Sequence, residues 1–374
     1  MTTDPELRAP LPAERRAHLL AALDRDGVVR VADVSRALGV TPVTVRRDIT
    51  QLEQEGRLVR VHGGAVPAEA SAARDGGVPV PPPTSQAIGV LVPSLDYYWP
   101  GVVRGMEAEA RERGLRVVLR GSSYAATDER PALERLAGAD GVSGLILAPR
   151  TDGARGGEIA QWLRACGLPH VLVEREATLP QHREALESVV SDHALGALMA
   201  VHHLADLGHR RVGLVLSRES PTSRKIAAGW SAACAELGLS SQEHFERLAP
   251  DRRTPEFPGV VTEVVDTAVA SGTTALLVHS DPEASAVVQE AMDRGLSVPG
   301  DLSVLSYDDE VAGLFSPALT AVQPPRAAVG RAAVDLLVKR LADPGRPVHR
   351  TAISPRLVVR ESTGPVRPVT SGGR

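Results

Sequence analysis

The stretch TPVTVRRDITQLEQEGRLVRVHGGAV, residues 41–66, decides how the N-terminal part of this chain folds. Thr41 is a good helix N-cap, and Pro42 suits the first helical position, where its missing N–H costs nothing. Gly56 is a typical residue for ending a helix. The stretch therefore predicts a capped helix, followed by the short hairpin discussed below.

The two sides of this helix differ in chemistry. Val45, Ile49 and Leu52 recur at helical spacing, so they must face a core. The opposite side and its flanks carry Val43, Thr44, Arg46, Arg47, Thr50 and Gln51. Arginine can bind guanine through two hydrogen bonds, and glutamine can bind adenine in the same way. This face therefore favours contact with base edges in the major groove of DNA.

Two helices and a hairpin complete the unit. Residues 12–25 and 31–40 predict helices, with Val34, Ala37 and Leu38 of the second helix facing inward. After residue 56, an apolar run predicts a strand, Gly63-Gly64 a turn, and Ala65-Val66 the returning strand. A helix, a turn, a second helix and a hairpin form a winged helix-turn-helix.

Residues 15–66 resemble the DeoR-type DNA-binding domain, whose pattern is T-x-R-R-D followed by L-x-x-x-G-x-L-x-R-x-H-G-G-A. The matching positions here are Thr44 to Asp48, then Leu52, Gly56, Leu58, Arg60 and His62 to Ala65. The resemblance implies a recognition helix over 43–55 and a wing that contacts the DNA backbone or minor groove. The predicted DNA-binding residues are Thr41, Val43, Thr44, Arg46, Arg47, Gln51, Arg57, Arg60, His62 and Gly63.

Bulk charge does not reveal a DNA partner. The formal net charge is -4, and acidic and basic residues nearly balance within residues 1–66. Attraction to phosphate must therefore come from a few placed groups, above all Arg46, Arg57 and Arg60. We expect modest non-specific affinity and a homodimer for tight binding to a palindromic double-stranded operator.

Composition also suggests where the protein works. The two cysteines, Cys166 and Cys234, are too few for a disulfide framework, which favours thiols in a reducing compartment. The N-terminus has no apolar core of a secretory signal, and no apolar run approaches the length of a membrane span. We expect a cytoplasmic protein without a membrane partner.

Composition divides the chain into regions. Residues 12–66 form the predicted winged helix-turn-helix domain. Residues 67–86, PAEASAARDGGVPVPPPTSQ, cannot bury a core and predict a linker stiffened by proline. Residues 87–362 form the predicted ligand-binding domain, and the polar residues 363–374 predict a disordered tail.

From residue 87 onward, short apolar strands alternate with amphipathic helices. The expected strands are 88–92, 116–120, 144–148, 170–174, 188–192, 211–216, 274–279 and 302–307. The expected helices are roughly 100–113, 130–138, 157–166, 193–207, 222–237, 260–271, 283–294 and 325–342. This pattern predicts an α/β fold with parallel sheets covered on both faces, and its length favours two lobes.

The same region resembles the sensor domain of LacI/GalR regulators, which has a two-lobed periplasmic-binding-protein-like fold. The landmarks are VVSDHALGALMAVHHLADLGHRRVGLV (189–215), SRKIAAGW (223–230), GLSVPGDLSVLSYDD (295–309), SPALTAVQPP (316–325) and PRLVVRES (355–362). The resemblance implies three crossings between lobes, near residues 190, 322 and 354, with a small molecule between them. The N-lobe is then about 87–190 and 325–354, and the C-lobe about 191–322 and 355–362.

The resemblance also indicates ligand-binding residues. Arg224 matches the arginine that clamps the ligand, although a solvated arginine at a helix start is the alternative. Asp308 matches the carboxylate that accepts sugar hydroxyls, whereas Asp309 is expected to cap or support a hinge and Asp281 to bond backbone amides. The other candidates are Tyr97, Tyr98, Trp99, Glu174, Arg175, Asp192 and Ser280. Tyr97 to Trp99 form a loop cluster in a chain that is only 3% aromatic, and dimer contact competes with ligand binding there.

Two departures from the LacI pattern leave the effector open. Position 280 is serine where asparagine is usual, and position 324 is proline where glutamine is frequent. The proline-rich linker also cannot form the hinge helix of LacI-type proteins. A neutral sugar is the first expectation, because Asp308 would repel an anion, and a purine, nucleoside or sugar phosphate is the alternative.

Other classes of protein have less support. The chain lacks the G-x-S-x-G, P-loop and G-x-G-x-x-G motifs of common enzyme classes. His202, His203 and His209 suggest a solvated helix face rather than a metal site. We expect no enzyme activity, cofactor or metal, and a transport-type solute-binding protein does not fit the DNA-binding domain. The sequence predicts a ligand-responsive transcriptional regulator, with repression as the first expectation and activation as the open alternative.

Overall fold

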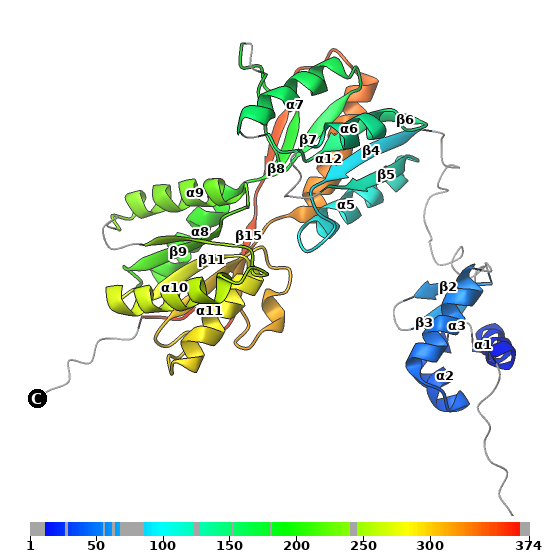
Figure 1. Ribbon diagram of the computed structural model, residues 1–374, viewed down its shortest axis with the longest axis horizontal. Helices are drawn as coiled ribbons and strands as arrows, with labels where there is room; N and C mark the ends of the chain where they lie inside the picture. Colours follow the sequence, from blue (N-terminus) through cyan, green and yellow to red (C-terminus); the bar gives the residue numbers. More distant parts are fainter. Residues whose placement is uncertain are drawn as a thin grey trace, which may run out of the picture. The chain divides into compact units, whose positions relative to one another are not determined.

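The chain forms two compact units, Met1–Val80 and Pro81–Arg374 (Figure 1). The structure is a computed structural model, and each unit is described by itself. It describes residues 12–26, 29–54, 57–61, 64–67, 86–122, 128–151, 153–179, 182–239 and 245–366.

The first unit is a three-helix domain with a small antiparallel sheet. Its helices are α1 (Pro12–Asp26), α2 (Val31–Leu38) and α3 (Pro42–Gln54). Its strands are β1 (Val29–Arg30), β2 (Leu58–Val61) and β3 (Gly64–Pro67), in the order β1-β3-β2. Leu19, Ile49 and Leu52 are at most 2% exposed, so the apolar side of α3 lies in the core. The predicted winged arrangement is present, with β1 as an additional strand.

The second unit contains two six-stranded sheets, and the first of them forms the N-lobe. Its order is β14-β8-β7-β6-β4-β5, with every pairing parallel. The strands are β4 (Ala87–Val92), β5 (Arg116–Gly121), β6 (Val142–Leu147), β7 (His170–Val173), β8 (Ser188–Ser191) and β14 (Arg350–Ile353). The helices are α5 (Trp99–Glu112), α6 (Arg130–Ala137), α7 (Gly153–Ala165) and α12 (Arg326–Ala342).

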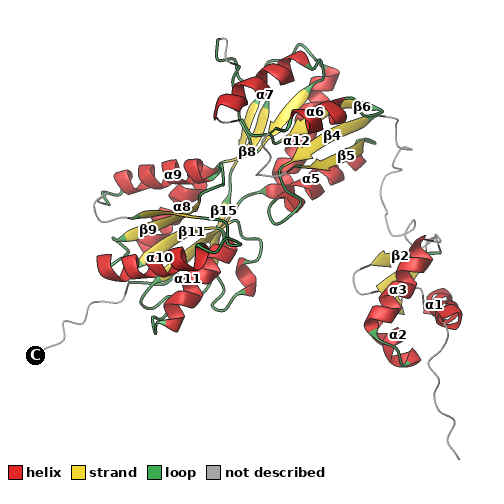
Figure 2. Ribbon diagram, viewed as in Figure 1, coloured by secondary structure: helices red, strands yellow, loops and turns green. Residues whose placement is uncertain are grey.

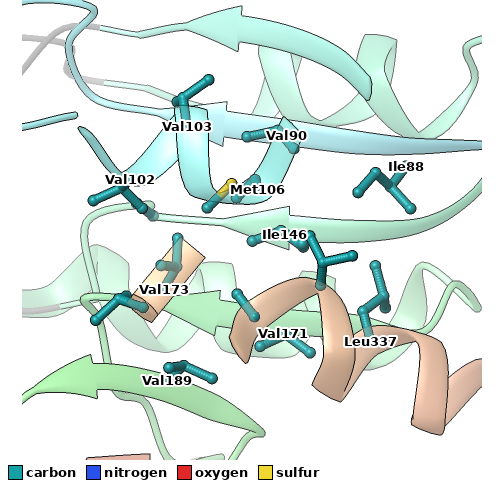
Figure 3. Close-up of a cluster of buried hydrophobic side chains, with 14 of the residues drawn as sticks. Ile88, Val90, Val102, Val103, Met106, Ile146, Val171, Val173, Val189 and Leu337 are labelled. Atoms are coloured by element: carbon teal, nitrogen blue, oxygen red, sulfur yellow. The ribbon is translucent and has the colours of Figure 1, made fainter. Parts of the chain in front are cut away.

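Helices cover both faces of the N-lobe sheet. On one face α5 and α12 pack against Ile88, Val90, Ile146 and Val171, all fully buried (Figure 3). On the other face, α6 and α7 pack against the leucines of β4, β6 and β7. Burial on both faces explains why these strands read as continuous apolar runs.

The second sheet forms the C-lobe, in the order β10-β9-β11-β12-β13-β15. The strands are β9 (Val212–Ser217), β10 (Glu246–Ala249), β11 (Ala275–His279), β12 (Ser303–Tyr307), β13 (Thr320–Gln323) and β15 (Arg356–Val358), which runs antiparallel to β13. The helices are α8 (His193–Asp206), α9 (Ser223–Glu236), α10 (Phe257–Ser271), α11 (Asp281–Asp293) and the short η2 (Ala312–Leu314). Helices α8 and α9 cover one face, while α10 and α11 cover the other (Figure 2).

The chain passes between the lobes three times. The first passage leads from β8 into α8, the second from β13 into α12, and the third from β14 to β15. The two-lobed α/β fold predicted from the sequence is confirmed. No helix within the described ranges is long and apolar enough to cross a lipid bilayer.

Some sequence expectations were wrong. Ala37 of α2 is exposed rather than inward. Strands β10, β13, β14 and β15 were missed. Three of them, β10, β14 and β15, lie at sheet edges, where β14 is largely exposed and carries little apolar pattern, and β13 is only four residues long. The 18 residues from 68 to 85, which include nearly all of the expected linker, lie outside the described residues.

The predicted start of the disordered tail, at residue 363, lies too early in the chain. Thr363 is buried, and its hydroxyl lies 2.8 Å from the Thr320 hydroxyl. Gly364 O is 3.0 Å from His209 Nε2, and Val366 N donates to Leu207 O at 3.1 Å. Residues 363–366 therefore continue the C-lobe, and residues 367–374 lie outside the described residues.

Candidate functional site

The first candidate site is the exposed side of α3. Thr41 caps the helix, because its hydroxyl accepts a hydrogen bond from Thr44 N at 3.3 Å. Val45 is 1% exposed on the core side, while Arg47 and Gln51 are exposed on the other side. The helix therefore presents the arginine and the glutamine that the sequence indicated.

The structure describes only some of the remaining predicted DNA-binding residues. Thr44 is half-buried, and Arg57 is exposed directly after α3. Candidates whose side chains or whole residues lie outside the described part are Val43, Arg46, Arg60, His62 and Gly63.

Asp48 of the R-R-D motif has a structural role that sequence reasoning missed. It is 5% exposed and receives two hydrogen bonds from Arg15, one from Nε at 2.7 Å and one from the guanidinium Nη2 at 3.2 Å. The carboxylate in turn raises the pKa of Arg15 through the side-chain hydrogen bond. This bidentate pair fixes α1 against α3 and so orients the exposed face.

The second candidate site is a cleft between the lobes of the second unit. It contains two adjoining cavities of about 820 and 1260 Å³, both lined by Pro93, Glu174, Arg175, His193 and Ser217. These residues end or follow strands of the two sheets, or begin α8. The cleft thus lies at the carboxyl ends of parallel strands, where ligands of such folds bind.

Glu174 organises the floor of this cleft. It follows β7 with a φ of 54° and is 6% exposed. Its carboxylate accepts hydrogen bonds from the Tyr98 hydroxyl (2.7 Å), Ser191 Oγ (2.7 Å) and Ser191 N (3.1 Å), and His193 Nε2 lies 3.3 Å away. Burial alone would raise the pKa of Glu174, but the hydrogen bonds from His193, Tyr98 and Ser191 lower it to about 2. Groups of the protein itself therefore occupy much of the hydrogen-bonding capacity of this carboxylate.

The three residues of the aromatic cluster, Tyr97, Tyr98 and Trp99, lie in three different environments. Tyr97, with a φ of 57°, lines the larger cavity, and its hydroxyl accepts a hydrogen bond from Asp281 N at 3.3 Å. Tyr98 also lines that cavity but is bonded to Glu174. Trp99 borders the cavity yet is 1% exposed and belongs to the N-lobe core. Arg175 lies over the Trp99 ring at 5.7 Å, so the tryptophan supports a cleft residue.

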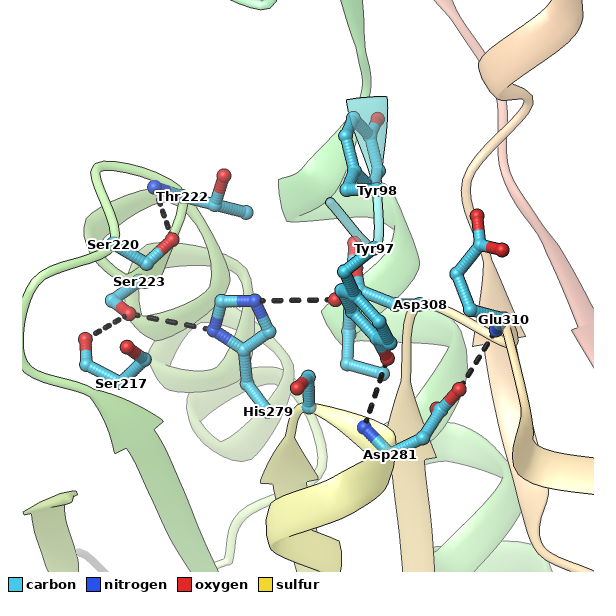
Figure 4. Close-up of polar contacts among 12 residues, drawn as sticks. Tyr97, Tyr98, Ser217, Ser220, Thr222, Ser223, His279, Asp281, Asp308 and Glu310 are labelled. Carbon is cyan, nitrogen blue, oxygen red and sulfur yellow. Dashed lines mark hydrogen bonds and ion pairs between the residues drawn. The ribbon is translucent and has the colours of Figure 1, made fainter. Parts of the chain in front are cut away.

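Asp308 and Ser280 both line the larger cavity. Asp308 is 5% exposed, and its pKa is raised well above the usual range by burial and by the nearby charge of Asp281. His279 Nε2 lies 3.7 Å from Asp308 Oδ2 (Figure 4). Ser280 caps α11, and its hydroxyl donates to Glu283 at 2.6 Å. The serine hydroxyl is therefore partly committed to the helix start.

Arg224 and Asp192 occupy different places. Arg224 is exposed at the start of α9 and lines the smaller cavity. Asp192 caps α8 by accepting a hydrogen bond from Leu195 N at 3.0 Å, and it lines neither cavity. The capping contact gives Asp192 a structural role at the start of α8.

The two acidic residues expected to be structural behave in that way. Asp281 is fully buried and accepts hydrogen bonds from the backbone N–H groups of Glu310 (2.7 Å) and Val311 (2.9 Å). Asp309 accepts from Gln323 Nε2 at 2.6 Å and pairs with Arg360 at 2.7 Å, beside the passages between lobes. Both support the loop that carries Asp308.

Sequence reasoning missed several cleft residues. His193 and His279 line the larger cavity, and Arg326 pairs with Glu310 at 2.6 Å. Lys225 of the C-lobe pairs with Glu176 of the N-lobe at 2.8 Å. The position of His279 at the end of a buried strand is a signal that could have identified it.

Two of the three histidines discussed for a metal site, His203 and His209, are packed into the C-lobe. His209 is 2% exposed and bonded to Thr274, and His203 is bonded to Thr363. The expectation of a solvated helix face is therefore wrong for these two. Within the described part of the chain, no group of three or more His, Cys, Asp or Glu could hold a metal ion.

Comparison with known families matches both units separately. Residues 15–70 match the DeoR-like helix-turn-helix domain, and residues 201–363 match the periplasmic binding protein-like domain. Relatives that match over nearly their whole length are helix-turn-helix transcriptional regulators. In this regulator a DeoR-like domain is fused to a periplasmic-binding-protein-like domain, as the sequence predicted.

Relatives of the regulator include other helix-turn-helix proteins. An uncharacterised regulator of Streptomyces limosus is 37% identical over 53% of this chain and 55% of its own length. The regulator MalR of Streptomyces coelicolor is 27% identical over 89% of this chain and 96% of its own. The arabinose metabolism transcriptional repressor of Geobacillus stearothermophilus is 25% identical over 86% of both chains. These relatives are transcriptional regulators rather than enzymes.

Solved structures resemble the second unit of the regulator. A LacI transcriptional regulator from Rhodococcus has a TM-score of 0.63 and 25% identity, covering 75% of this chain and 99% of its own. A LacI family regulator from Enterococcus faecium, solved with bound ribose, has a TM-score of 0.61 and 21% identity, covering 75% and 100%. The latter likeness concerns the fold.

Proposed function

We propose that this regulator is a repressor whose binding to operator DNA responds to a neutral sugar-like metabolite in the cleft between its lobes. The observation that carries the proposal is the combination of two surfaces in one chain. One is the exposed Arg47 and Gln51 on a capped helix, and the other is a polar cleft lined by Arg224 and Asp308. The name of the arabinose repressor and the ribose in the Enterococcus faecium structure support a sugar.

The sensor lobes are proposed as residues 87–190 with 325–354 and residues 191–322 with 355–362. Effector binding would shift the population of lobe arrangements, and hence the orientation of two DNA-binding domains within a dimer. Because a proline-rich linker cannot form a LacI-type hinge helix, we propose that orientation rather than hinge folding transmits the signal. Leu314 and Val359 of the C-lobe, 83% and 59% exposed, offer apolar surface for dimer contact.

The DNA assignment is tested by comparing specific and random DNA. Arg47→Ala is expected to weaken binding to fragments from the gene's own neighbourhood by about 10- to 100-fold while sparing binding to random DNA, since an arginine fork reads one base. Arg57→Ala is expected to weaken both equally, because it is assigned to phosphate. Arg25→Ala on α1 serves as a control. Equal loss on both DNAs for Arg47→Ala would contradict base reading.

The effector assignment is tested separately. Arg224→Ala is expected to bind operator like the wild type but to lose the response to any sugar that changes wild-type binding. Gel retardation with and without the sugar measures both properties, and Arg130→Ala on the N-lobe surface is the matched control. An unaltered response would remove Arg224 from the site.

A further inference from the structure

His279 is placed to contact whatever occupies the larger cavity. It ends β11, is 6% exposed and lines this cavity together with Tyr97 and Asp308 (Figure 4). Neither the sequence motifs nor the proposed function above gives it a role.

The imidazole of His279 is held on two sides. Its Nδ1 lies 3.5 Å from Ser223 Oγ, and the ring meets Tyr307 edge-on, with centroids 5.8 Å apart at 79°. The Ser223 hydroxyl donates to Ser217 O at 2.7 Å. Since that hydrogen is already engaged, the serine oxygen can only accept from the imidazole. Nδ1 therefore carries the ring hydrogen, and Nε2 presents a lone pair.

That lone pair faces Asp308. The 3.7 Å between His279 Nε2 and Asp308 Oδ2 is too long for a direct hydrogen bond. However, one oxygen atom can lie about 2.8 Å from both groups, within hydrogen-bond range. The gap thus suits a single bridging oxygen atom that accepts a hydrogen bond from one of the two groups and donates a hydrogen bond to the other.

Burial favours the neutral forms of both groups over an ion pair. Burial, followed by the charge of Asp281, raises the pKa of Asp308, while burial and the nearby His193 lower the pKa of His279 to about 3. The acid then donates and the imidazole accepts. A hydroxyl group both accepts and donates at one atom, whereas a planar base presents these functions at separate atoms.

We propose that His279 determines the effector class of this regulator by binding, together with Asp308, one hydroxyl group of a neutral polyol. The inference rests on the proposed function, in which a metabolite occupies this cleft. A phosphate at the same place would lie close to Asp281 and Glu283, whose negative charges also act on Asp308 and disfavour a second anion. Recognition through an uncharged pair selects for hydroxyl groups without selecting for charge.

Calorimetric titration of the full-length protein tests this assignment. The probes are D-ribose, L-arabinose, D-glucose and maltose, with ribose 5-phosphate and hypoxanthine as the competing classes. Wild-type protein is expected to bind a neutral sugar, and His279→Leu to bind it about 10- to 100-fold more weakly, because one hydrogen bond is lost in a buried site. His279→Gln, whose amide oxygen can accept the same bond, should recover part of the loss. His182→Leu, at an exposed turn, is the control.

Deoxy analogues of the bound sugar identify the hydroxyl. The analogue that lacks the bridging hydroxyl should bind wild-type protein and His279→Leu equally, because each change removes the same contact. This comparison uses wild-type protein and His279→Gln if His279→Leu does not fold. Unchanged sugar affinity in the histidine variants would overturn the proposal, as would binding of only ribose 5-phosphate or hypoxanthine, or of no neutral sugar. Operator retardation is measured independently, so its failure would instead contradict the proposed function.

Discussion

At the scale of single residues, Glu174 shows how a buried charge is kept in this fold. Three elements supply its partners, since Tyr98 precedes α5, Ser191 ends β8 and His193 begins α8. Without these donors the desolvated carboxylate would be strongly unfavourable. The residue therefore ties the cleft floor together and fixes Tyr98 at its edge.

The stability that Glu174 contributes to the folded protein should depend on pH. Its pKa falls from about 4.5 to about 2 in the folded protein, so the charged form stabilises the fold above pH 4.5 and loses this effect as the pH falls toward 2. The full contribution is about 3 kcal/mol. Urea unfolding at pH 7 and pH 3 should show the wild type losing much of its advantage over Glu174→Gln. The exposed Glu112→Gln controls for general acid effects, and an advantage that stays constant with pH would refute this role.

At the scale of elements, the N-lobe depends on an unusually close pair of helices. A Cβ atom on Gly330 of α12 would lie 2.1 Å from Val102 O of α5, and one on Gly105 of α5 would lie 2.2 Å from Ala327 O. No side chain fits at either position. The two glycines therefore allow backbone-to-backbone contact, at the cost of weaker helix propensity.

Gly330→Ala should force α5 and α12 apart. We expect a loss of about 2–3 kcal/mol in unfolding free energy, because the added methyl group overpacks a rigid backbone contact. The matched control is Gly259→Ala in α10, where a Cβ would meet nothing within 4 Å, and this change should stabilise by about 0.5–1 kcal/mol. Denaturant unfolding of both variants measures the contrast. Equal effects of the two substitutions would contradict the close contact.

At the scale of the sensor unit, contacts join the lobes across the cleft. Glu176 of the N-lobe pairs with Lys225 of the C-lobe at 2.8 Å and also contacts Arg350. Tyr97 of the N-lobe accepts a hydrogen bond from Asp281 N of the C-lobe. These contacts hold the lobes together around the cleft, and Glu176 and Lys225 are each about one-third exposed.

Removing this ion pair should favour a more open arrangement of the lobes. An exposed ion pair contributes up to about 1 kcal/mol, so Lys225→Met is expected to shift the ratio of open to closed protein by up to about fivefold. Pulsed dipolar spectroscopy with one spin label in each lobe should report longer distances for this variant. Lys339→Met, which removes an ion pair within α12, is the control. Identical distance distributions in the variant and the wild type would rule out a role in closure.

The sequence alone determined the recognition helix, its cap and the alternation of most strands with helices. These features depend on turn chemistry and on apolar spacing between near neighbours, as at Thr41, Val45 and Ile49. Family resemblance added Asp308 and Arg224, both of which line the cleft. Edge strands such as β14 were not predicted, because exposed strands carry little apolar pattern.

Only the tertiary structure decided what each polar candidate touches. It bonded Asp192 to a helix start, buried most of Trp99 in the core, and brought His279 to within 3.7 Å of Asp308. It also joined Arg15 to Asp48, which lie 33 positions apart in the chain. Such contacts form between side chains of different elements, so their partners depend on how helices and sheets pack and not on local spacing.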